Sequence, residues 1–412
     1  MRRPTQPPRR LGFTLVELMV VMVVLGVLIA LLVPAIGGAI KSARAAQVTA
    51  EINNIATALA QFKSTYSDYP PSRILLHENG YYNTVDPTRV SAAFSDVRSD
   101  ITVGQLNQRT VRYMAKFFPR ALCFSTTGAS SATVTEFNGY VYNPSNGNYS
   151  LTAGEAIYLD GSECLVWFLG GQCLASSGTS PNPTGGTYSG GSSLPAPTWG
   201  ATGFGRNPAN PFYISGASTI TPQSSRTQPF FEFKGERLVD VDGDGFPSYN
   251  DSLATGTQGR AYAYFSAYGG NSYDPNDCNL NANDALGHNL NDGFARAFSV
   301  NFPVEVNAFN TCAAAPSSTC VSPAPNPYTS SGPVGGTSPT VWQGPQSFQI
   351  ISAGSDQIFG IGGQFAGNNA TNRLGFPDGP YGSVCGATAP VDDGRTPEAD
   401  NLSNFVSTRL NQ

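Results

Sequence analysis

The sequence predicts an α+β protein, in which one long N-terminal helix packs on a β-rich and loop-rich region with large insertions. An apolar run with a single charge covers residues 13–36, and a helical stripe of apolar residues follows over 48–66. The chain also has 45 glycines and 31 prolines but only 12% charged residues, which favours turns and short strands after residue 70. The expected segments are residues 1–12, 13–36, 37–69 and 70–412.

The apolar run from Phe13 to Ile36 is long enough to cross a membrane. At about 1.5 Å per residue, a helix of this length spans roughly 36 Å, against a hydrocarbon core of about 30 Å. Arginines are dense before the run, and only Lys41 and Arg44 follow it closely. The positive-inside rule therefore predicts a single span with its N-terminus in the cytoplasm and the rest of the chain on the far side.

One acidic residue, Glu17, interrupts this run. A carboxylate inside a bilayer is costly, so Glu17 is a candidate functional residue. An ordinary secretory signal peptide would have a shorter apolar core of about 7–15 residues with a cleavage site next to it. The small-x-small site Ala43-Arg44-Ala45 lies well beyond the run instead. A simple signal anchor explains the length and orientation of the run but not Glu17.

The string from Gly12 to Glu17, GFTLVE, resembles the cleavage and methylation site of the type IV pilin and type II secretion pseudopilin family. The resemblance implies that prepilin peptidase removes a leader, residues 1–12, by cutting between Gly12 and Phe13, and then N-methylates Phe13. Pro34 matches the helix-bending proline of the family. The protein is then expected in the bacterial inner membrane, with its C-terminal domain periplasmic, or extracellular in an assembled filament.

Cleavage would leave a cationic amine on Phe13, about one helical turn from Glu17. Inside the low-dielectric membrane the carboxylate needs an opposite charge nearby. The amine of a neighbouring subunit can supply that charge in a staggered helical filament. Glu17 is therefore the expected assembly residue, and the expected partners are prepilin peptidase, the inner membrane and other pilin or pseudopilin subunits.

Beyond the membrane run the helix is expected to continue as an amphipathic segment. Its apolar positions alternate in steps of four and three, which places them on one helical face. These positions are Val48, Ile52, Ile55, Leu59, Phe62 and Tyr66. The helix should end near Ser67 because the pair at 70–71 is Pro-Pro. Residues 58–70 resemble the end of this helix in the major pseudopilin of type II secretion, which favours the pseudopilin branch over adhesive pilins.

The region after residue 70 is expected to contain short strands and long loops. A helix is plausible over residues 107–118, and residues 176–200 and 313–340 are rich in Gly, Ser, Pro and Thr and are expected to be loops. The clearest strand patterns cover residues 230–233, 261–268 and 347–352. The family resemblance covers the first 70 residues well, and the C-terminal half only by pattern.

All seven cysteines lie beyond the membrane run, where an oxidising compartment permits disulfides. The pairs Cys164/Cys173 and Cys312/Cys320 are closest in sequence and are the candidate bridges. The odd number leaves at least one thiol unpaired or intermolecular.

The first candidate metal site is the segment 240–251, DVDGDGFPSYND. Aspartates at positions 1, 3, 5 and 12 of a twelve-residue loop, with Gly at position 6, match the spacing of a calcium loop, and the carbonyl at position 7 is a further ligand. The candidate ligands are Asp240, Asp242, Asp244, Phe246 and Asp251. The flanks read as strand and loop, so an EF-hand domain is not predicted. An acidic surface turn is the alternative.

The second candidate follows the last predicted strand. Residues 351–363 resemble the Ser-x-Gly-x-Asp-Gly segment in the C-terminal calcium loop of major pseudopilins, which implies Ser352 and Asp356 as weaker ligand candidates. Gln357 stands where the family has glycine, so the resemblance does not define the conformation of this loop. A glycine-rich turn after a strand is the alternative. Calcium is thus the expected cofactor.

Signals for catalysis are few. The chain has two histidines, and it contains no zinc-protease, phosphate-loop or nucleophile-elbow pattern. A net charge of −5 disfavours binding to nucleic acid. The sequence therefore predicts a structural subunit, not an enzyme, of a type II secretion pseudopilus or related type IV filament that supports protein secretion. The alternatives are a minor pilin or surface adhesin with a ligand-binding C-terminal domain, and a membrane-tethered calcium-dependent hydrolase.

Overall fold

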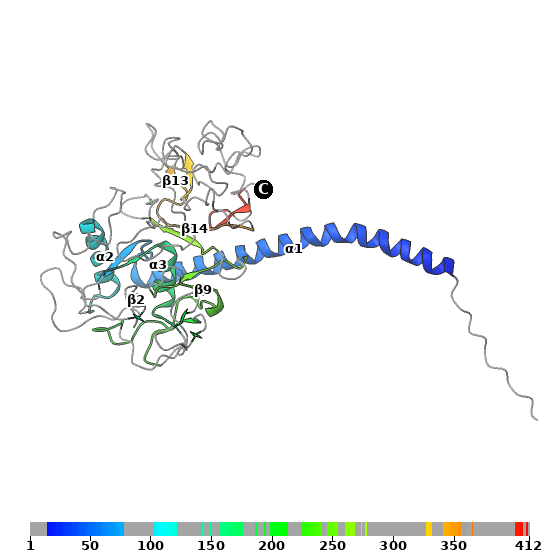
Figure 1. Ribbon diagram of the computed structural model, residues 1–412. Coiled ribbons are helices and arrows are strands. Elements are labelled where there is room, and N and C mark those ends of the chain that lie inside the picture. Colours follow the sequence, from blue (N-terminus) through cyan, green and yellow to red (C-terminus); the bar gives the residue numbers. More distant parts are fainter. Residues whose placement is uncertain are drawn as a thin grey trace, which may run out of the picture. The chain divides into compact units, whose positions relative to one another are not determined.

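Two compact units make up the chain in the computed structural model, residues 1–47 and residues 48–412 (Figure 1). Each unit is described by itself below. The structure describes residues 15–77, 103–121, 142–143, 148–149, 156–175, 186–187, 193–194, 198–212, 224–240, 245–253, 260–267, 273, 277, 327–331, 341–355, 357, 359, 365, 400–406 and 409–410.

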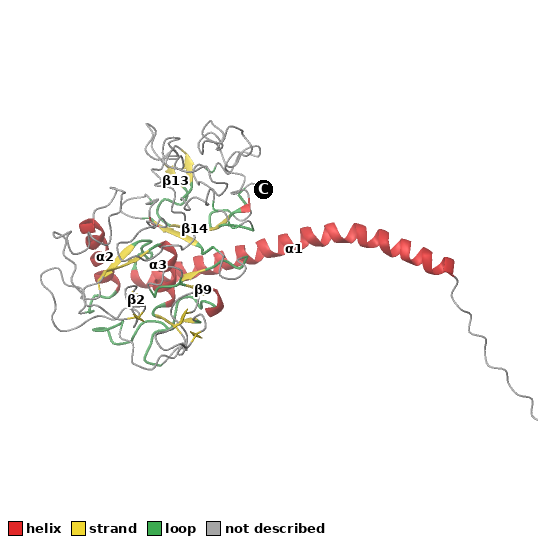
Figure 2. Cartoon of the chain, viewed as in Figure 1, coloured by secondary structure: helices red, strands yellow, loops and turns green. Residues whose placement is uncertain are grey.

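Helices and short strands alternate along these residues, so the α+β class is confirmed (Figure 2). The helices are α1 (Leu15–Tyr66), α2 (Val103–Phe117), α3 (Gly161–Gly170) and the 3-10 helix η2 (Gly235–Arg237). The first strands are β1 (Ile74–His77), β2 (Tyr142–Asn143), β3 (Asn148–Tyr149), β4 (Ala156–Leu159), β5 (Cys173–Ala175), β6 (Gly186–Thr187), β7 (Ser193–Leu194) and β8 (Trp199–Ala201). The later strands are β9 (Leu238–Val239), β10 (Ser248–Tyr249), β11 (Ala263–Ser266), β12 (Thr329–Ser331), β13 (Val341–Trp342), β14 (Phe348–Ser352) and β15 (Leu402–Ser403).

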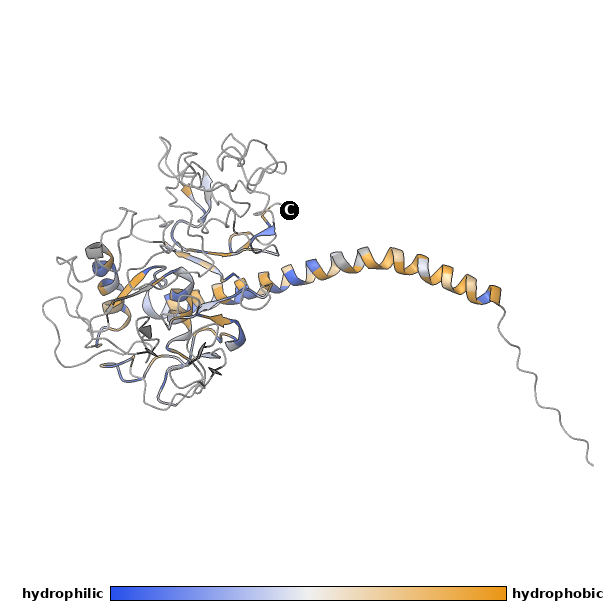
Figure 3. Cartoon of the chain, in the orientation of Figure 1, coloured by the Kyte–Doolittle hydropathy of each residue, from blue (hydrophilic) through white to orange (hydrophobic). Residues whose placement is uncertain are grey.

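The first unit contains the apolar part of α1. The helix begins at Leu15 and passes Pro34 without a break. Its large apolar side chains are exposed, Leu15 by 73% and Leu31 by 71%, and Figure 3 shows this part of the helix coloured as hydrophobic almost throughout. Of the described helices, α1 alone is long and apolar enough to cross a membrane. Such all-round apolar exposure suits a segment surrounded by lipid or by other helices.

The second unit begins with the amphipathic part of α1. The predicted stripe is confirmed, because the side chains of Val48, Ile52, Ile55, Leu59 and Phe62 are at most 1% exposed. The helix ends at Tyr66, as predicted, since Ser67 adopts a left-handed φ of 60° and its N–H donates to the Lys63 carbonyl at 2.7 Å.

An aromatic core joins this part of α1 to the other helices. The ring of Phe62 lies 5.1 Å from Phe117 of α2, 6.0 Å from Phe168 of α3 and 5.3 Å from Phe230. The helix predicted near residues 107–118 is thus α2, whereas α3 has no counterpart among the predicted elements. Every residue of α3 is buried, and Asp160 and Glu163 form a capping box at its start.

The largest sheet of the described residues has the order β11-β14-β15 and is antiparallel. Strands β11 and β14 confirm the patterns at 261–268 and 347–352. The prediction of a strand over residues 230–233 is wrong. The N–H groups of Phe230 and Phe231 donate to the Leu169 carbonyl at the end of α3, not to a neighbouring β-strand. Short strands also interrupt both predicted loops: β6, β7 and the start of β8 lie in 176–200, and β12 lies in 313–340.

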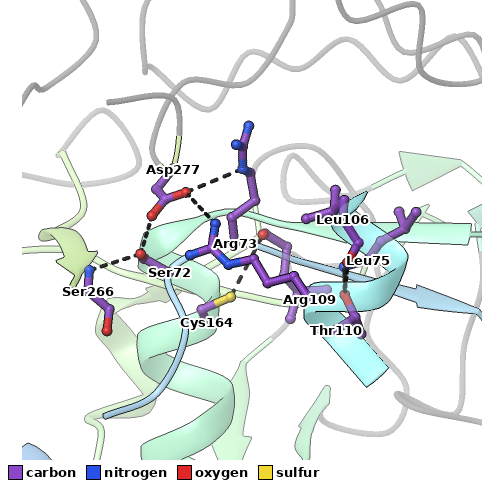
Figure 4. A network of polar contacts seen from close by, with 10 residues as sticks. Ser72, Arg73, Leu75, Leu106, Arg109, Thr110, Cys164, Ser266 and Asp277 are labelled. Atoms are coloured by element: carbon purple, nitrogen blue, oxygen red, sulfur yellow. Dashed lines mark hydrogen bonds and ion pairs between the residues drawn. The ribbon is translucent and has the colours of Figure 1, made fainter. Parts of the chain in front are cut away.

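A buried polar network ties α2 to the segments around it (Figure 4). The carboxylate of Asp277 accepts a hydrogen bond from Ser72 and pairs with Arg73 Nε at 3.3 Å and Arg109 Nη1 at 3.4 Å. The Ser72 hydroxyl in turn accepts from the N–H of Ser266 on β11 at 2.9 Å. All of these side chains are at most 2% exposed, so the network is buried and its charges are paired within it.

Candidate functional site

The predicted processing site lies at the very start of the chain. Gly12 and Phe13 are outside the described residues, so their geometry stays a prediction. Glu17 lies in the first turn of α1 and is exposed among the apolar side chains of the first unit. The carboxylate is thus presented on the lateral surface of the apolar helix, where a neighbouring chain can reach it.

The first candidate calcium loop, residues 240–251, begins directly after β9 and contains β10. Asp240, Phe246 and Asp251 are at most 2% exposed, whereas Asp242 and Asp244 lie outside the described residues. The loop closes locally, since Asp240 Oδ2 accepts the N–H of Gly245 at 3.0 Å.

The structure does not bring Asp251 back to Asp240. Val239 pairs with Ser248, and the N–H of Asn250 donates to the Arg237 carbonyl. Strand β10 therefore runs antiparallel to β9 and carries Asp251 away from Asp240. From Ser248 to Asp251 an extended chain covers roughly 10 Å. A twelve-residue loop that wraps around one ion needs its last ligand near its first, so Asp251 cannot close the predicted loop.

Asp251 instead joins the second candidate. Its Oδ2 accepts the hydroxyl of Ser352 at 2.6 Å, and its Oδ1 accepts the N–H of Leu253 at 2.7 Å. Ser352 is the last residue of β14 and is fully buried. The structure therefore brings together one residue from each predicted site.

The turn after β14 explains how glutamine replaces glycine. Gln357 adopts a left-handed φ of 61°, the conformation that glycine adopts at least cost. Its side chain holds the turn, because Oε1 accepts the N–H of Arg260 at 2.8 Å and Nε2 donates to the Gly354 carbonyl at 2.7 Å. These bonds offset the backbone strain. Asp356 itself lies outside the described residues.

A further carboxylate, Asp400, meets this turn from the C-terminal end of the chain. Its Oδ2 accepts the N–H of Ser355 at 2.7 Å and the Ser355 hydroxyl. Its Oδ1 is buried and has no hydrogen-bond donor among the described residues. Gly354, with a φ of 69°, leaves the room that Asp400 needs, since an added Cβ would collide with Oδ1.

We call Asp251, Ser352 and Asp400 the oxygen cluster, because Asp251 contacts the last residue of β14, which is Ser352, and Asp400 contacts the turn that follows it. Its hard oxygen atoms are of the kind that Ca²⁺ prefers, and the described part of the chain offers the buried Oδ1 of Asp400 no donor, which a buried acceptor requires. The described residues contain no group of three or more His, Cys, Asp or Glu side chains arranged for a metal. Sequence reasoning missed Asp400, because a lone Asp-Asn pair so distant from Ser352 carries no signal.

A second acidic residue of α1, Glu51, attaches the helix to the domain. Its carboxylate pairs with Arg237 of η2 through two bonds, Nη1–Oε1 at 2.5 Å and Nη2–Oε2 at 2.8 Å. Oε1 also accepts the hydroxyl of Tyr249 at 3.0 Å, and Oε2 accepts that of Tyr262 at 2.6 Å. We call these four residues the Glu51 clamp. Sequence reasoning missed it because its members are far apart along the chain.

The clamp keeps Glu51 ionised. Burial by itself raises the pKa of Glu51, but the hydrogen bonds from Arg237 and Tyr262, the charge of Arg237 and the bond from Tyr249 outweigh it and hold the pKa below 4.5. Burial raises the pKa of Tyr249 and of Tyr262, so both hydroxyls keep their protons for donation.

The predicted bridge between Cys164 and Cys173 is not formed. Both are buried thiols, and their Sγ atoms donate to the carbonyls of Leu159 and Gly171. Cys164 lies in the first turns of α3, whereas Cys173 begins β5 after the end of that helix. Burial raises the pKa of Cys173 to about 12 and that of Cys164 well above its usual range. Cys312 and Cys320 lie outside the described residues.

Comparison with known proteins identifies the N-terminal segment. Residues 7–33 match the family model of the prokaryotic N-terminal methylation motif, which is characteristic of the prepilin-type signal of type IV pilins and pseudopilins. The motif supports a type IV pilin-like protein with a prepilin-type signal, which implies processing by prepilin peptidase and assembly with pilin subunits in general. Helix α1 is the matching candidate for a single membrane span. No curated protein and no solved structure matches the chain.

Proposed function

We propose that the protein is a structural, non-enzymatic subunit of a type II secretion pseudopilus or a related type IV filament. The observation that carries this proposal is the division of α1 within a single helix. Its first part exposes apolar side chains on all faces, whereas its second part buries one stripe in the domain. Such a helix can pack against copies of itself through the first part and carry a folded domain on the second.

In this proposal the N-terminus faces the cytoplasm before processing and the second unit lies in the periplasm. The arginines before the apolar run support that orientation. Glu17 then pairs with the methylated amine of Phe13 in a neighbouring subunit, which sets the axial register of the helices. The filament core consists of helices, and the second units cover its surface.

The test is mass spectrometry of the N-terminus after expression with and without prepilin peptidase. We expect a mature chain that starts at N-methylated Phe13 when the peptidase is present, and the uncut chain when it is absent. A chain that still starts at Met1 with the peptidase, or one that starts at Ala46, would contradict the proposal.

We also propose that the oxygen cluster binds Ca²⁺. Asp251 and Asp400 would supply carboxylate oxygens and Ser352 a hydroxyl, and the ion would neutralise the carboxylates that contact the end of β14 and the turn after it. The buried Oδ1 of Asp400 supports this, because a cation would satisfy an acceptor that no described donor reaches. Asp356, from the same turn, is the further ligand that the family resemblance implies.

Calorimetric titration of the full-length chain in detergent with CaCl₂ tests this proposal. The wild type should bind calcium, and Asp400→Asn should bind it at least tenfold more weakly. Asp68→Asn removes an exposed carboxylate elsewhere and should change nothing. Equal binding by wild type and Asp400→Asn would remove Asp400 from the site.

A further inference from the structure

Arg237 contacts two parts of the second unit at once. On one side its guanidinium holds the Glu51 carboxylate of α1 through the paired bonds of the clamp. On the other side its Nε donates to the Asn250 carbonyl at 2.9 Å, and its Nη2 donates to the same oxygen. The guanidinium also lies over the ring of Tyr249, 4.3 Å from its centre. One side chain therefore joins the helix to the end of β10.

The carbonyl that Arg237 holds is one residue from the oxygen cluster. Asn250 directly precedes Asp251, whose carboxylate accepts the Ser352 hydroxyl at 2.6 Å. The oxygen bound by Arg237 therefore belongs to the same peptide group as the backbone nitrogen of Asp251, a proposed calcium ligand. The peptide group is planar and stiff, so the position of the Asn250 carbonyl also sets that of the Asp251 backbone nitrogen.

The backbone on both sides of this peptide is also held. The N–H of Asn250 donates to the Arg237 carbonyl at 2.9 Å, and the N–H of Asp251 donates to the Arg260 carbonyl at 3.0 Å. Arg260 in turn donates its N–H to Gln357 of the turn after β14. The segment 250–251 thus has little freedom to adjust by itself, and its position depends on the clamp at one end and on the turn at the other.

We propose that Glu51 and Arg237 are positioning residues for the cation site, which set its affinity for calcium without touching the ion. The proposal rests on the calcium binding proposed above. The clamp holds Asn250 and therefore fixes where Asp251 presents its carboxylate. By thermodynamic reciprocity, calcium must then strengthen the attachment of α1 to the domain by the same factor.

The experiment is calorimetric titration with CaCl₂ of the full-length chain in detergent, for wild type, Glu51→Gln and Arg237→Lys. We expect the Kd for calcium to rise about fivefold or more in both variants. A factor of about five is the lower end of the affinity changes that typical coupling between two sites produces. The rise of Tm that calcium produces in the wild type should shrink in both. Lysine keeps the charge of Arg237 but cannot reach Glu51 and Asn250 together, so it should not rescue binding.

Asp68→Asn is the matched control. It removes the ion pair of Asp68 with Lys116 just beyond the end of the same helix, where both side chains are about 40% exposed. Its Kd for calcium should remain within twofold of the wild-type value. A rise as large as that of Glu51→Gln would show that any lost helix contact weakens binding, which would overturn a specific role of the clamp.

The failures are distinguishable. A wild-type chain that does not bind calcium contradicts the cation site, and the present inference with it. Wild-type calcium affinity in Glu51→Gln contradicts only the inference. If Glu51→Gln does not fold, Tyr262→Phe removes one 2.6 Å hydrogen bond and leaves the Arg237 pair in place. It should raise Kd by a smaller factor in the same direction, and an unchanged Kd would overturn the inference.

Discussion

Two glutamates on the same helix illustrate two ways to accommodate a carboxylate. Glu17 lies in the part of α1 that exposes apolar side chains on every face. Glu51 lies where the helix enters the domain, is 13% exposed, and receives donors from Arg237, Tyr249 and Tyr262. The protein thus surrounds Glu51 with its own groups, whereas the proposed partner of Glu17 belongs to another subunit.

The difference separates assembly from folding. A carboxylate whose partners come from the same chain contributes to the stability of each molecule. An ion pair between two molecules, such as the one proposed for Glu17, contributes only when the molecules associate, and most where water is excluded. Loss of Glu17 should therefore affect the filament, and loss of Glu51 should affect the fold.

The largest effect is expected for Glu17→Leu. The variant should insert into the membrane and fold normally, because leucine suits the apolar helix, but it should assemble into no filaments when it is the sole subunit. Electron microscopy of sheared filaments and membrane fractionation measure the two properties. Val16→Leu, a neighbouring apolar exchange, is the control and should assemble. Normal filaments from Glu17→Leu would contradict the proposed role.

Glu51→Ala should instead destabilise the second unit by about 3 kcal/mol, as expected when one partner of a largely buried ion pair is removed. The change leaves the largely buried Arg237 guanidinium without its carboxylate and removes an acceptor from two tyrosines. Chemical unfolding of the full-length chain in detergent, followed by tyrosine fluorescence, measures the loss. A change below about 0.5 kcal/mol would mean that the clamp contributes no more than an exposed pair.

Acid should weaken the contribution of Glu51 to the free energy of unfolding. The pKa of Glu51 in the folded chain lies below its ordinary 4.5, so its contribution is full above pH 4.5 and is lost as the pH falls through the folded value. The stability difference between wild type and Glu51→Gln should therefore shrink from about pH 7 to about pH 3. Thermal melts of both chains across this range measure the difference, and a gap that widens on acidification would contradict the assigned direction.

Asp68 provides the smallest effect. Its pair with Lys116 spans 2.8 Å, but both side chains are about 40% exposed. Exposed ion pairs typically contribute about 0–1 kcal/mol and weaken in salt. Asp68→Asn should thus change Tm by no more than about 2 °C, and high salt should remove even that change. A loss of stability comparable to that of Glu51→Ala would contradict the expectation that the buried pair stabilises the protein more than the exposed pair does.

Elements with a regular spacing could be predicted from the sequence. The stripe from Val48 to Phe62 identified α1 and the face that it buries, and the alternating pattern near Tyr264 identified β11. Helix α3 was missed because it is apolar on all sides and too short for a period to stand out, although Asp160 and Glu163 mark its start. The aromatic run at 230–233 looks like a strand by composition, but its N–H groups satisfy the end of α3.

The candidate site was less predictable, because it depends on contacts between distant segments. Asp251 was assigned to a calcium loop by its spacing from Asp240, yet the direction of β10 moves it next to Ser352. Asp400 gave no local signal at all. Spacing in a sequence defines a metal loop only where the chain turns back on itself, and a strand within the loop removes that condition.

The Glu51 clamp also constrains the order of events during synthesis. Glu51 is separated from Arg237 by 186 positions and from Tyr262 by 211. Glu51 therefore leaves the ribosome long before its three clamp partners, and closure of so long a chain segment is slow. Before Tyr262 emerges, the apolar stripe of α1 can already pack on Phe117 of α2 and Phe168 of α3, but Glu51 still lacks its complete set of donors. The polar attachment of α1 is therefore completed later in synthesis than its apolar packing.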